Sequence, residues 1–134
     1  MNCGANWKIS AMSILVVEDD TSVNRAIQTA LIASGYCVKS AETCAEGFSL
    51  ASRRTPSLLV LDLELPDGTG WGLLNDIRRA SPRKESEELK VIVISSTRVT
   101  RAQLRDNRIA RFLAKPFDMG YLLETVSEVL ALPQ

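Results

Sequence analysis

Four short runs of almost purely apolar residues limit what this chain can fold into more than any other feature of its sequence. The runs are Ile14–Val17, Leu58–Leu61, Val91–Ile94 and the weaker Phe112–Ala114. Runs of this length that are rich in Val, Ile and Leu are typical of parallel strands buried on both faces. A fifth segment, Tyr36–Lys39, alternates apolar and polar residues, which favours an edge strand. The sequence therefore predicts five strands, of which the second and the fifth are the weakest.

Helical patterns alternate with these strands. Apolar residues recur at the spacing of one helical face in four segments, which are Val23–Leu31, Cys44–Ala51, Leu73–Ile77 and Leu122–Leu130. Asp20 and Asp118 precede two of these segments as capping residues, and Gly35 closes the first. Residues 100–107 should form the fourth helix in chain order. Their apolar residues do not share a face, so we expect a short or irregular helix there.

The alternation of strands and helices predicts an α/β fold with a parallel sheet and helices on both faces, because each right-handed crossover needs a helix packed on the sheet. A doubly wound sheet of order 2-1-3-4-5 would place the two weaker strands at the edges. A chain of 134 residues has room for one domain of this kind. We expect it to occupy residues 13–132, after an N-terminal extension at residues 1–12 to which the sequence assigns no role.

Composition narrows the chemistry that this domain can perform. Hydrophobic residues make up 46% of the chain and charged residues 24%, as in an ordinary globular domain. Lys and Arg together number 16, as do Asp and Glu, which argues against binding nucleic acid or a membrane surface through bulk charge. The absence of histidine excludes His-activated nucleophiles and His-ligated metals, and the three cysteines form no CxxC zinc motif. No apolar run is long enough to span a membrane, and a cytoplasmic protein is the default expectation.

Polar residues follow four of the predicted strands. These segments are Glu18-Asp19-Asp20 after the first strand, Asp62 after the third, Ser95-Ser96 after the fourth and Lys115-Pro116 after the fifth. Because the carboxyl ends of parallel strands lie at one edge of a sheet, we expect these side chains to meet there, where open α/β sheets bind ligands.

Clustered carboxylates repel one another unless protons or a cation relieve them. Carboxylate and carbonyl oxygens suit a hard ion such as Mg²⁺, which favours a phosphoryl oxygen as a further partner. A carboxylate beside Mg²⁺ and an ammonium group is equipped to attack a phosphoryl group, because both cations neutralise charge on the transferring oxygens. The pattern therefore indicates phosphoryl-transfer chemistry at this edge.

Over Ser13 to about Leu132, the sequence resembles the receiver domain of two-component response regulators, such as the chemotaxis regulators. The resemblance is carried by four motifs in the right order, which are Ile-Leu-Val-Val-Glu18-Asp19-Asp20, Val60-Leu61-Asp62-Leu63-Glu64-Leu65-Pro66-Asp67-Gly68 with Gly70, Val-Ile-Val-Ile-Ser95-Ser96 and Phe112-Leu-Ala-Lys115-Pro116-Phe117. It implies a flavodoxin-like (βα)5 fold.

The resemblance also implies roles for the site residues. Asp62 would accept the phosphoryl group. Asp19 and Asp62 would bind Mg²⁺ directly with the backbone carbonyl of Glu64, and Glu18 would act mainly through a bound water. Lys115 would pair with the phosphoryl oxygens.

Two further residues would report the modification to the rest of the domain. Ser95 would be the switch hydroxyl and Phe112 the aromatic switch residue, with plain edge packing as the alternative for Phe112. The peptide bond before Pro116 is expected to be cis, a state that is rarely populated without proline.

A receiver would take its phosphoryl group from a sensor histidine kinase or a histidine phosphotransfer protein, and would change its surface toward a downstream protein or effector domain. Because it would also hydrolyse its own acyl phosphate, it would be a phosphorelay switch with modest catalysis, and not a conventional turnover enzyme. No direct nucleic acid binding by this domain is expected. The sequence leaves open the cognate kinase, the output partner and whether the protein forms a homodimer.

Two other functions compete with this interpretation. The segment Leu59–Glu64 also resembles the nucleophile strand of haloacid-dehalogenase-like phosphatases, with Asp62 as nucleophile. That family expects an Asp where Glu64 stands, and metal-binding acids after the nucleophile. A flavodoxin-like flavin binder would need a phosphate-binding loop after the first strand, where this chain has acidic residues that repel phosphate.

Arginines at positions 98, 101, 105 and 108 have helical spacing and would align on one face of a fourth helix. A solvated face and a docking surface for an acidic partner are both compatible with this pattern.

Overall fold

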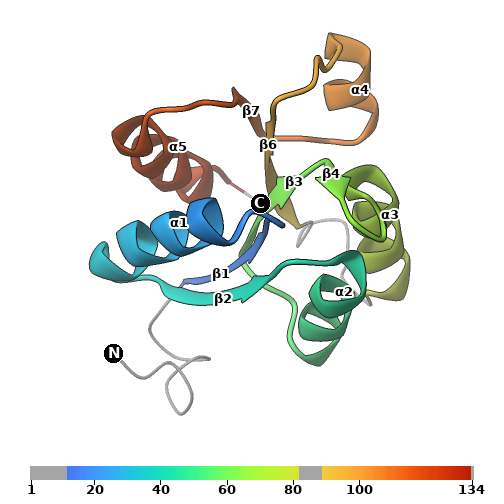
Figure 1. Ribbon diagram of the computed structural model, residues 1–134, viewed down its shortest axis with the longest axis horizontal. Coiled ribbons are helices and arrows are strands. Elements are labelled where there is room, and N and C mark those ends of the chain that lie inside the picture. The colour runs from blue at the N-terminus through green and yellow to red at the C-terminus, as the bar shows by residue number, and fades with distance from the viewer. Residues whose placement is uncertain (1–11, 82–88, 134) are drawn as a thin grey trace.

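The computed structural model describes residues 12–81 and 89–133 of the chain. Within them lies a parallel sheet of five strands in the order β2-β1-β3-β6-β7. The strands are β1 (Ser13–Val17), β2 (Cys37–Ala41), β3 (Leu58–Asp62), β6 (Lys90–Ser95) and β7 (Arg111–Ala114). The doubly wound order is confirmed, and the two weakest strands of the sequence, β2 and β7, form the edges (Figure 1).

Two very short strands, β4 (Glu64–Leu65) and β5 (Gly68–Thr69), pair as an antiparallel ribbon between β3 and the helix that follows it. The sequence did not predict this ribbon. A strand of two residues gives no alternation to detect, and the intervening Pro66-Asp67 pair shows only a turn.

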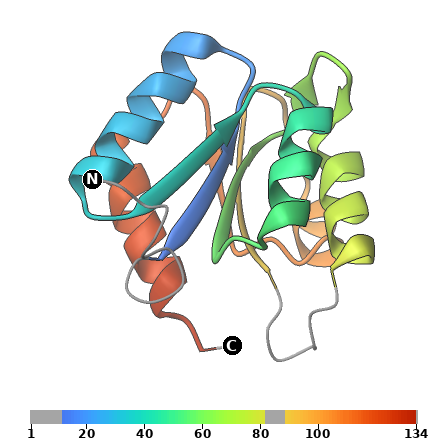
Figure 2. The ribbon, with the colours of Figure 1, turned by 90° about the horizontal axis from the view of Figure 1, so that it is seen from below.

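Helices cover both faces of the sheet. They are α1 (Thr21–Ala33), α2 (Cys44–Arg53), α3 (Gly70–Ala80), α4 (Arg101–Asp106) and α5 (Met119–Ala131). Helices α1 and α5 lie on one face, and α2 and α3 lie on the other (Figures 1 and 2).

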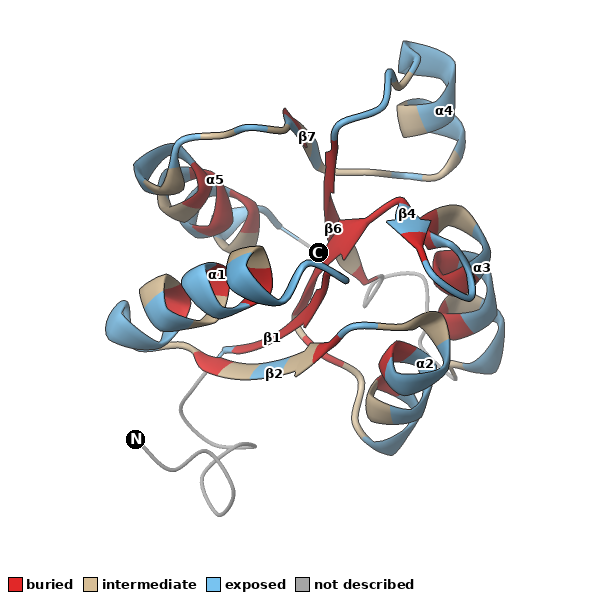
Figure 3. Cartoon of the chain, in the orientation of Figure 1, coloured by how far each residue is buried: buried red, intermediate tan, exposed pale blue. Residues whose placement is uncertain are grey.

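The core is divided by the sheet into two apolar layers, because successive residues of a strand point to opposite faces. Ile14 and Val16 of β1 belong to the layer under α1 and α5, with Leu122 and Val126. Leu15 and Val17 belong to the layer under α2 and α3, with Leu73 among their neighbours. Every residue of β1 and β3 is buried, as Figure 3 shows in red. This explains why their sequence lacks alternation.

Helix α4 differs from the other helices, since none of its residues is buried. Its first turn is held by a capping box, in which Thr100 Oγ1 accepts from the backbone N–H of Gln103 at 3.0 Å and Gln103 Oε1 accepts from the N–H of Thr100 at 2.9 Å. The expectation of a short helix is confirmed. The expectation that four arginines share one helical face is wrong, because only Arg101 and Arg105 lie within the helix.

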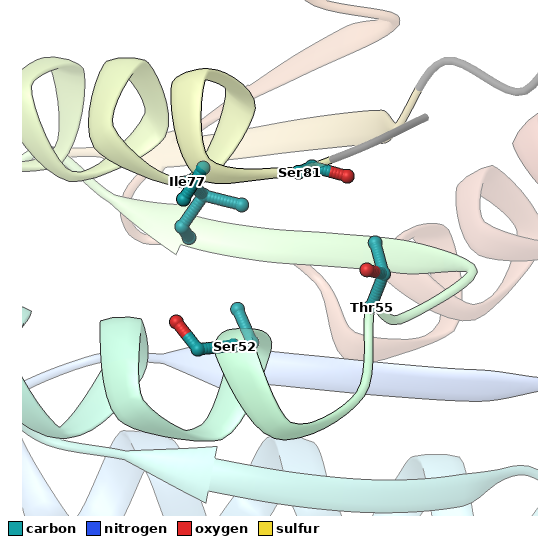
Figure 4. Close-up of a pocket in the computed structure, with 6 residues that line it drawn as sticks. Ser52, Thr55, Ile77 and Ser81 are labelled. Carbon is teal, nitrogen blue, oxygen red and sulfur yellow. The ribbon is translucent and has the colours of Figure 1, made fainter. Parts of the chain in front are cut away.

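A cavity of about 180 Å³ lies between the carboxyl-terminal ends of α2 and α3. Ser52 and Thr55 face Ile77 and Ser81 across it (Figure 4). Helices of a parallel α/β fold end near the edge where the next strand begins, so this cavity is remote from the edge at which Glu18, Asp62, Ser95 and Lys115 lie.

Two segments lie outside the described residues: the N-terminal extension apart from Met12, and residues 83–88, whose charged sequence predicts a solvated loop. In the two described stretches, no helix combines the length and the apolar character needed to cross a membrane.

Candidate functional site

The acidic segment after β1 turns one carboxylate inward and two outward. Glu18 is fully buried, whereas Asp19 and Asp20 are exposed. Asp20 caps α1, since its Oδ1 accepts from the backbone N–H of Val23 at 3.1 Å. The N–H of Asp20 donates to Glu18 Oε2 at 3.0 Å and holds the Glu18 carboxylate under the turn.

Asp62, the last residue of β3, lies beside this segment because β1 and β3 are neighbours in the sheet. Its side chain is 6% exposed and ion-pairs with Lys115, whose Nζ lies 3.2 Å from Asp62 Oδ2. Lys115 follows β7 and also ion-pairs with Glu18. Residues that are 97 positions apart in the chain, from 18 to 115, therefore meet around one aspartate.

The charges at this site perturb one another. Burial raises the pKa of Glu18 to about 7, in opposition to the hydrogen bonds from Lys115 and from the Asp20 amide, which lower it. Burial on its own would lower the pKa of Lys115, but the hydrogen bond and charge of Glu18, together with Asp62, outweigh it and raise that pKa. Lys115 is therefore protonated at neutral pH, whereas burial disfavours the ionised form of Glu18.

Carboxylate oxygens of Glu18, Asp19 and Asp62 lie within 4.8 Å of one another. This donor set fits a divalent cation, because hard ions prefer carboxylate oxygens and a second positive charge would relieve the buried Glu18. The predicted grouping of these three residues is thus found in the structure.

Glu64 does not add a carboxylate to this group, and its side chain is exposed. Its backbone N–H lies 3.4 Å from Asp62 Oδ1, which places the residue directly beside the aspartate. The resemblance to receiver domains assigns the backbone carbonyl of Glu64, and not its side chain, to the metal, and that role stays a prediction.

Ser95 ends β6, one residue past the position that pairs with Asp62. It is fully buried, and its hydroxyl lies 2.7 Å from Thr97 Oγ1 and accepts from the Thr97 N–H at 3.0 Å. Phe112, on the neighbouring strand β7, is half-buried and packs against the layer under α2 and α3. The Lys115–Pro116 peptide bond is cis, as predicted.

One residue of the site, Asn24, was not predicted from the sequence. Asn24 of α1 is buried, and its Nδ2 donates to the carbonyls of Glu18 at 2.8 Å and Ala41 at 3.0 Å. The side chain therefore ties the acidic segment to the end of β2. The available signal was an amide on the buried stripe of α1, three residues before Ile27 and seven before Leu31.

Comparisons with known proteins agree with this geometry. A family model described as the response regulator receiver domain matches residues 14–127. Among curated proteins, the KDP operon transcriptional regulatory protein KdpE of Escherichia coli (strain K12) is 37% identical over 112 residues, which cover 82% of this chain and 47% of that protein. The acid tolerance regulatory protein ActR of Rhizobium meliloti (strain 1021) is 33% identical over 111 residues, covering 83% of this chain and 56% of that protein. The chain thus spans about half the length of these relatives.

Solved structures show the same fold. A CheY-like response regulator receiver domain from Methanospirillum hungatei JF-1 superimposes with a TM-score of 0.81 at 27% identity, covering 90% of this chain and 94% of that one. The non-phosphorylated HemR receiver domain from Leptospira biflexa gives a TM-score of 0.79 at 29% identity, with 91% and 96% covered. Sequence, topology and site geometry coincide, and the chain belongs to the response regulator receiver domain family of two-component signalling.

Proposed function

We propose that this receiver domain accepts a phosphoryl group on Asp62 from the phosphohistidine of a sensor kinase or phosphotransfer protein, in a reaction that requires Mg²⁺. The observation that carries the proposal is the position of the Asp62 carboxylate. A carboxylate oxygen of Asp62 lies within 4.8 Å of carboxylate oxygens of Glu18 and Asp19, and its Oδ2 lies 3.2 Å from the ammonium of Lys115.

In the transfer, one oxygen of Asp62 would form a bond to phosphorus while the bond from phosphorus to the histidine nitrogen breaks. Asp19, Asp62 and the carbonyl of Glu64 would hold Mg²⁺, with Glu18 acting through a water. When bound, the ion neutralises charge on the phosphoryl oxygens. Lys115 would pair with a phosphoryl oxygen, and the contact between its Nζ and Asp62 Oδ2 at 3.2 Å supports this role.

The signal would leave the site through Ser95 and Phe112. The Ser95 hydroxyl lies 2.7 Å from Thr97 Oγ1 in this structure, and either hydroxyl can be the donor. On phosphorylation, Ser95 would donate its proton to a phosphoryl oxygen. Movement of Ser95 would open space beside β7 into which Phe112 can turn. The resulting change of surface would be read by a downstream protein or effector domain, in the cytoplasm.

The phosphatase alternative lacks comparable support. Its metal-binding acids should follow the nucleophile in the chain, whereas Glu18 and Asp19 precede Asp62 and come from a different strand. Turnover of an aryl phosphate through many cycles per chain would favour it.

The proposal is tested by incubating the protein with acetyl phosphate and Mg²⁺ and measuring the intact mass. The wild-type protein should gain the mass of one phosphoryl group, and Asp62→Asn should gain none because an amide is a poor nucleophile. Asp76→Asn, at an exposed acid of α3, is the matched control and should label like the wild type. Labelling of Asp62→Asn at the wild-type level would refute the assignment.

A further inference from the structure

The loop that joins β3 to α3 carries Glu64 and adds only Leu63 and Leu65 to the core. Every residue from Pro66 to Thr69 is exposed. The β4–β5 ribbon pairs only two residues on each side. Because ordering the backbone costs conformational entropy, the exposed part of a ribbon this short needs contacts outside itself to keep one conformation.

Asp67, at the turn of this ribbon, makes such contacts with α2. Its Oδ1 accepts from the backbone N–H of Cys44 at 2.7 Å, and its Oδ2 accepts from the N–H of Ala45 at 3.0 Å. Cys44 and Ala45 are the first two residues of α2, where N–H groups have no acceptor within the helix. The hydrogen bond from the Cys44 N–H lowers the pKa of Asp67 most, and the one from the Ala45 N–H lowers it further. The carboxylate is therefore ionised at neutral pH.

Helix α2 has a cap of its own, which is independent of Asp67. Thr43 Oγ1 accepts from the N–H of Glu46 at 3.1 Å. The Asp67 contacts therefore do more than complete a helix end, since they join it to a loop 22 to 23 positions further along the chain.

The other end of the loop is packed directly on the phosphoacceptor's backbone. The N–H of Gly70 donates to the carbonyl of Leu63 at 2.8 Å. A Cβ atom at Gly70 would lie 2.4 Å from the carbonyl oxygen of Asp62, so no larger residue fits without displacing that backbone. The loop is therefore closed at its base, where Gly70 binds Leu63, and tied at its turn by Asp67, and Glu64 lies between these two fixed points.

We infer that Asp67 is a positioning residue for the phosphoacceptor loop, which it fixes by binding the first two backbone amides of α2. Asp67 touches none of the reacting groups. It acts through the backbone of Leu63 and Glu64, and its effect on metal binding rests on the proposed function of Glu64. Outer contacts that orient metal ligands typically change metal affinity by about 10–100-fold when removed.

The test compares two variants that each remove a cap from the same helix. Asp67→Ala removes the link to the loop, and Thr43→Ala removes the helix's own cap and keeps the link. Amide hydrogen exchange of Glu64 and Gly70 is measured by NMR in the metal-free protein, and the Mg²⁺ dissociation constant is measured by calorimetry.

We expect Asp67→Ala to speed exchange at Glu64 and Gly70 and to weaken Mg²⁺ binding about tenfold. Thr43→Ala should leave both quantities near their wild-type values. Asp67→Asn, which keeps one acceptor oxygen, should fall between the wild type and Asp67→Ala.

Equal exchange rates at Glu64 and Gly70 in the two alanine variants would overturn the inference, because Asp67 would then be only a helix cap. A wild-type protein that binds no Mg²⁺ would instead count against the proposed function, while the exchange measurement would still decide whether Asp67 holds the loop.

Discussion

Helices α3 and α4 follow neighbouring strands of the sheet, yet they are held in place by different forces. Helix α3 has 11 residues and buries Gly70, Leu73, Leu74 and Ile77. Helix α4 has 6 residues and buries none. Figure 3 shows the contrast, with red on α3 and only tan and pale blue on α4.

Contacts at its ends hold α4: polar ones, and the packing of Val99 and Ile109 against the layer under α2 and α3. The capping box of Thr100 and Gln103 secures its first turn. At its other end, the guanidinium of Arg78 on α3 donates to the carbonyl of Asn107, the C-cap residue, and to that of Arg108 at 3.2 Å. The same side chain donates to the carbonyl of Leu89 at 3.3 Å, so it ties α4 to the start of β6.

Helix α3 therefore cannot move without opening the core, whereas α4 buries no side chain of its own and can shift by breaking surface hydrogen bonds and the packing of Val99 and Ile109. Segments that bury little apolar surface unfold locally at a low cost in free energy. Phe112 packs under α2 and α3, and Ser95 leads into the segment before α4. A structural change at the site can therefore shift α4 more easily than α3.

The largest difference should appear when a leucine of each helix is truncated. Leu74→Ala in α3 should lower the free energy of unfolding by about 2–5 kcal/mol, because the side chain is fully enclosed. Leu104→Ala in α4 should lower it by less than about 1 kcal/mol, since Leu104 is only half-buried. Urea unfolding followed by circular dichroism measures both values, and equal losses would break the comparison.

Removing the arginine between the two helices should loosen α4 selectively. Arg78→Ala should lower the free energy of local unfolding at the C-terminus of α4 by about 1–2 kcal/mol, because three carbonyls lose a charged donor. Hydrogen exchange in α4 should speed up while exchange in α3 stays slow. Arg79→Ala, at the exposed neighbouring arginine, is the matched control and should change neither helix.

Titration of Glu18 should change the global stability of the protein and leave the local stability of α4 unchanged. The pKa of Glu18 is raised to about 7 in the folded protein from an ordinary value of 4.5, so the folded state binds more protons between these values. Stability of the metal-free protein should therefore fall as pH rises from about 5 to about 7, by about 2 kcal/mol, and level off above pH 7. Glu18→Gln should flatten this dependence. Exchange in α4, corrected for the intrinsic effect of pH, should not follow it.

The smallest effect is expected from the capping box. Thr100→Ala should fray the first turn of α4 at a cost of about 0.5 kcal/mol, the low end for such caps, because α4 contributes little to global stability. Hydrogen exchange of the Gln103 amide is the sensitive readout. Gln103→Glu preserves the capping-box chemistry and should leave that amide protected. Fraying of equal size in both variants would contradict the assigned role of Thr100.

Much of the fold was present in the sequence because buried parallel strands have few alternatives. Ile14–Val17 and Leu58–Leu61 are apolar on both faces, and only a sheet covered on both sides accommodates them. The grouping of Glu18, Asp19, Asp62 and Lys115 followed from the same argument, since the ends of parallel strands share an edge. The roles of Asp62, Ser95 and Phe112 came from resemblance to a family, and they remain predictions.

The sequence by itself determined the sheet order and which segments contribute to the site, because both depend on short, continuous apolar runs whose burial dominates the folding energy. Only the tertiary structure decided that Asn24 ties the acidic segment to β2, that Asp67 reaches the start of α2 and that Arg78 holds the end of α4. Each of these contacts joins one polar side chain to backbone groups from a distant segment. Such a contact leaves no periodic pattern in the chain, since it depends on where the strands and helices have already placed the two partners.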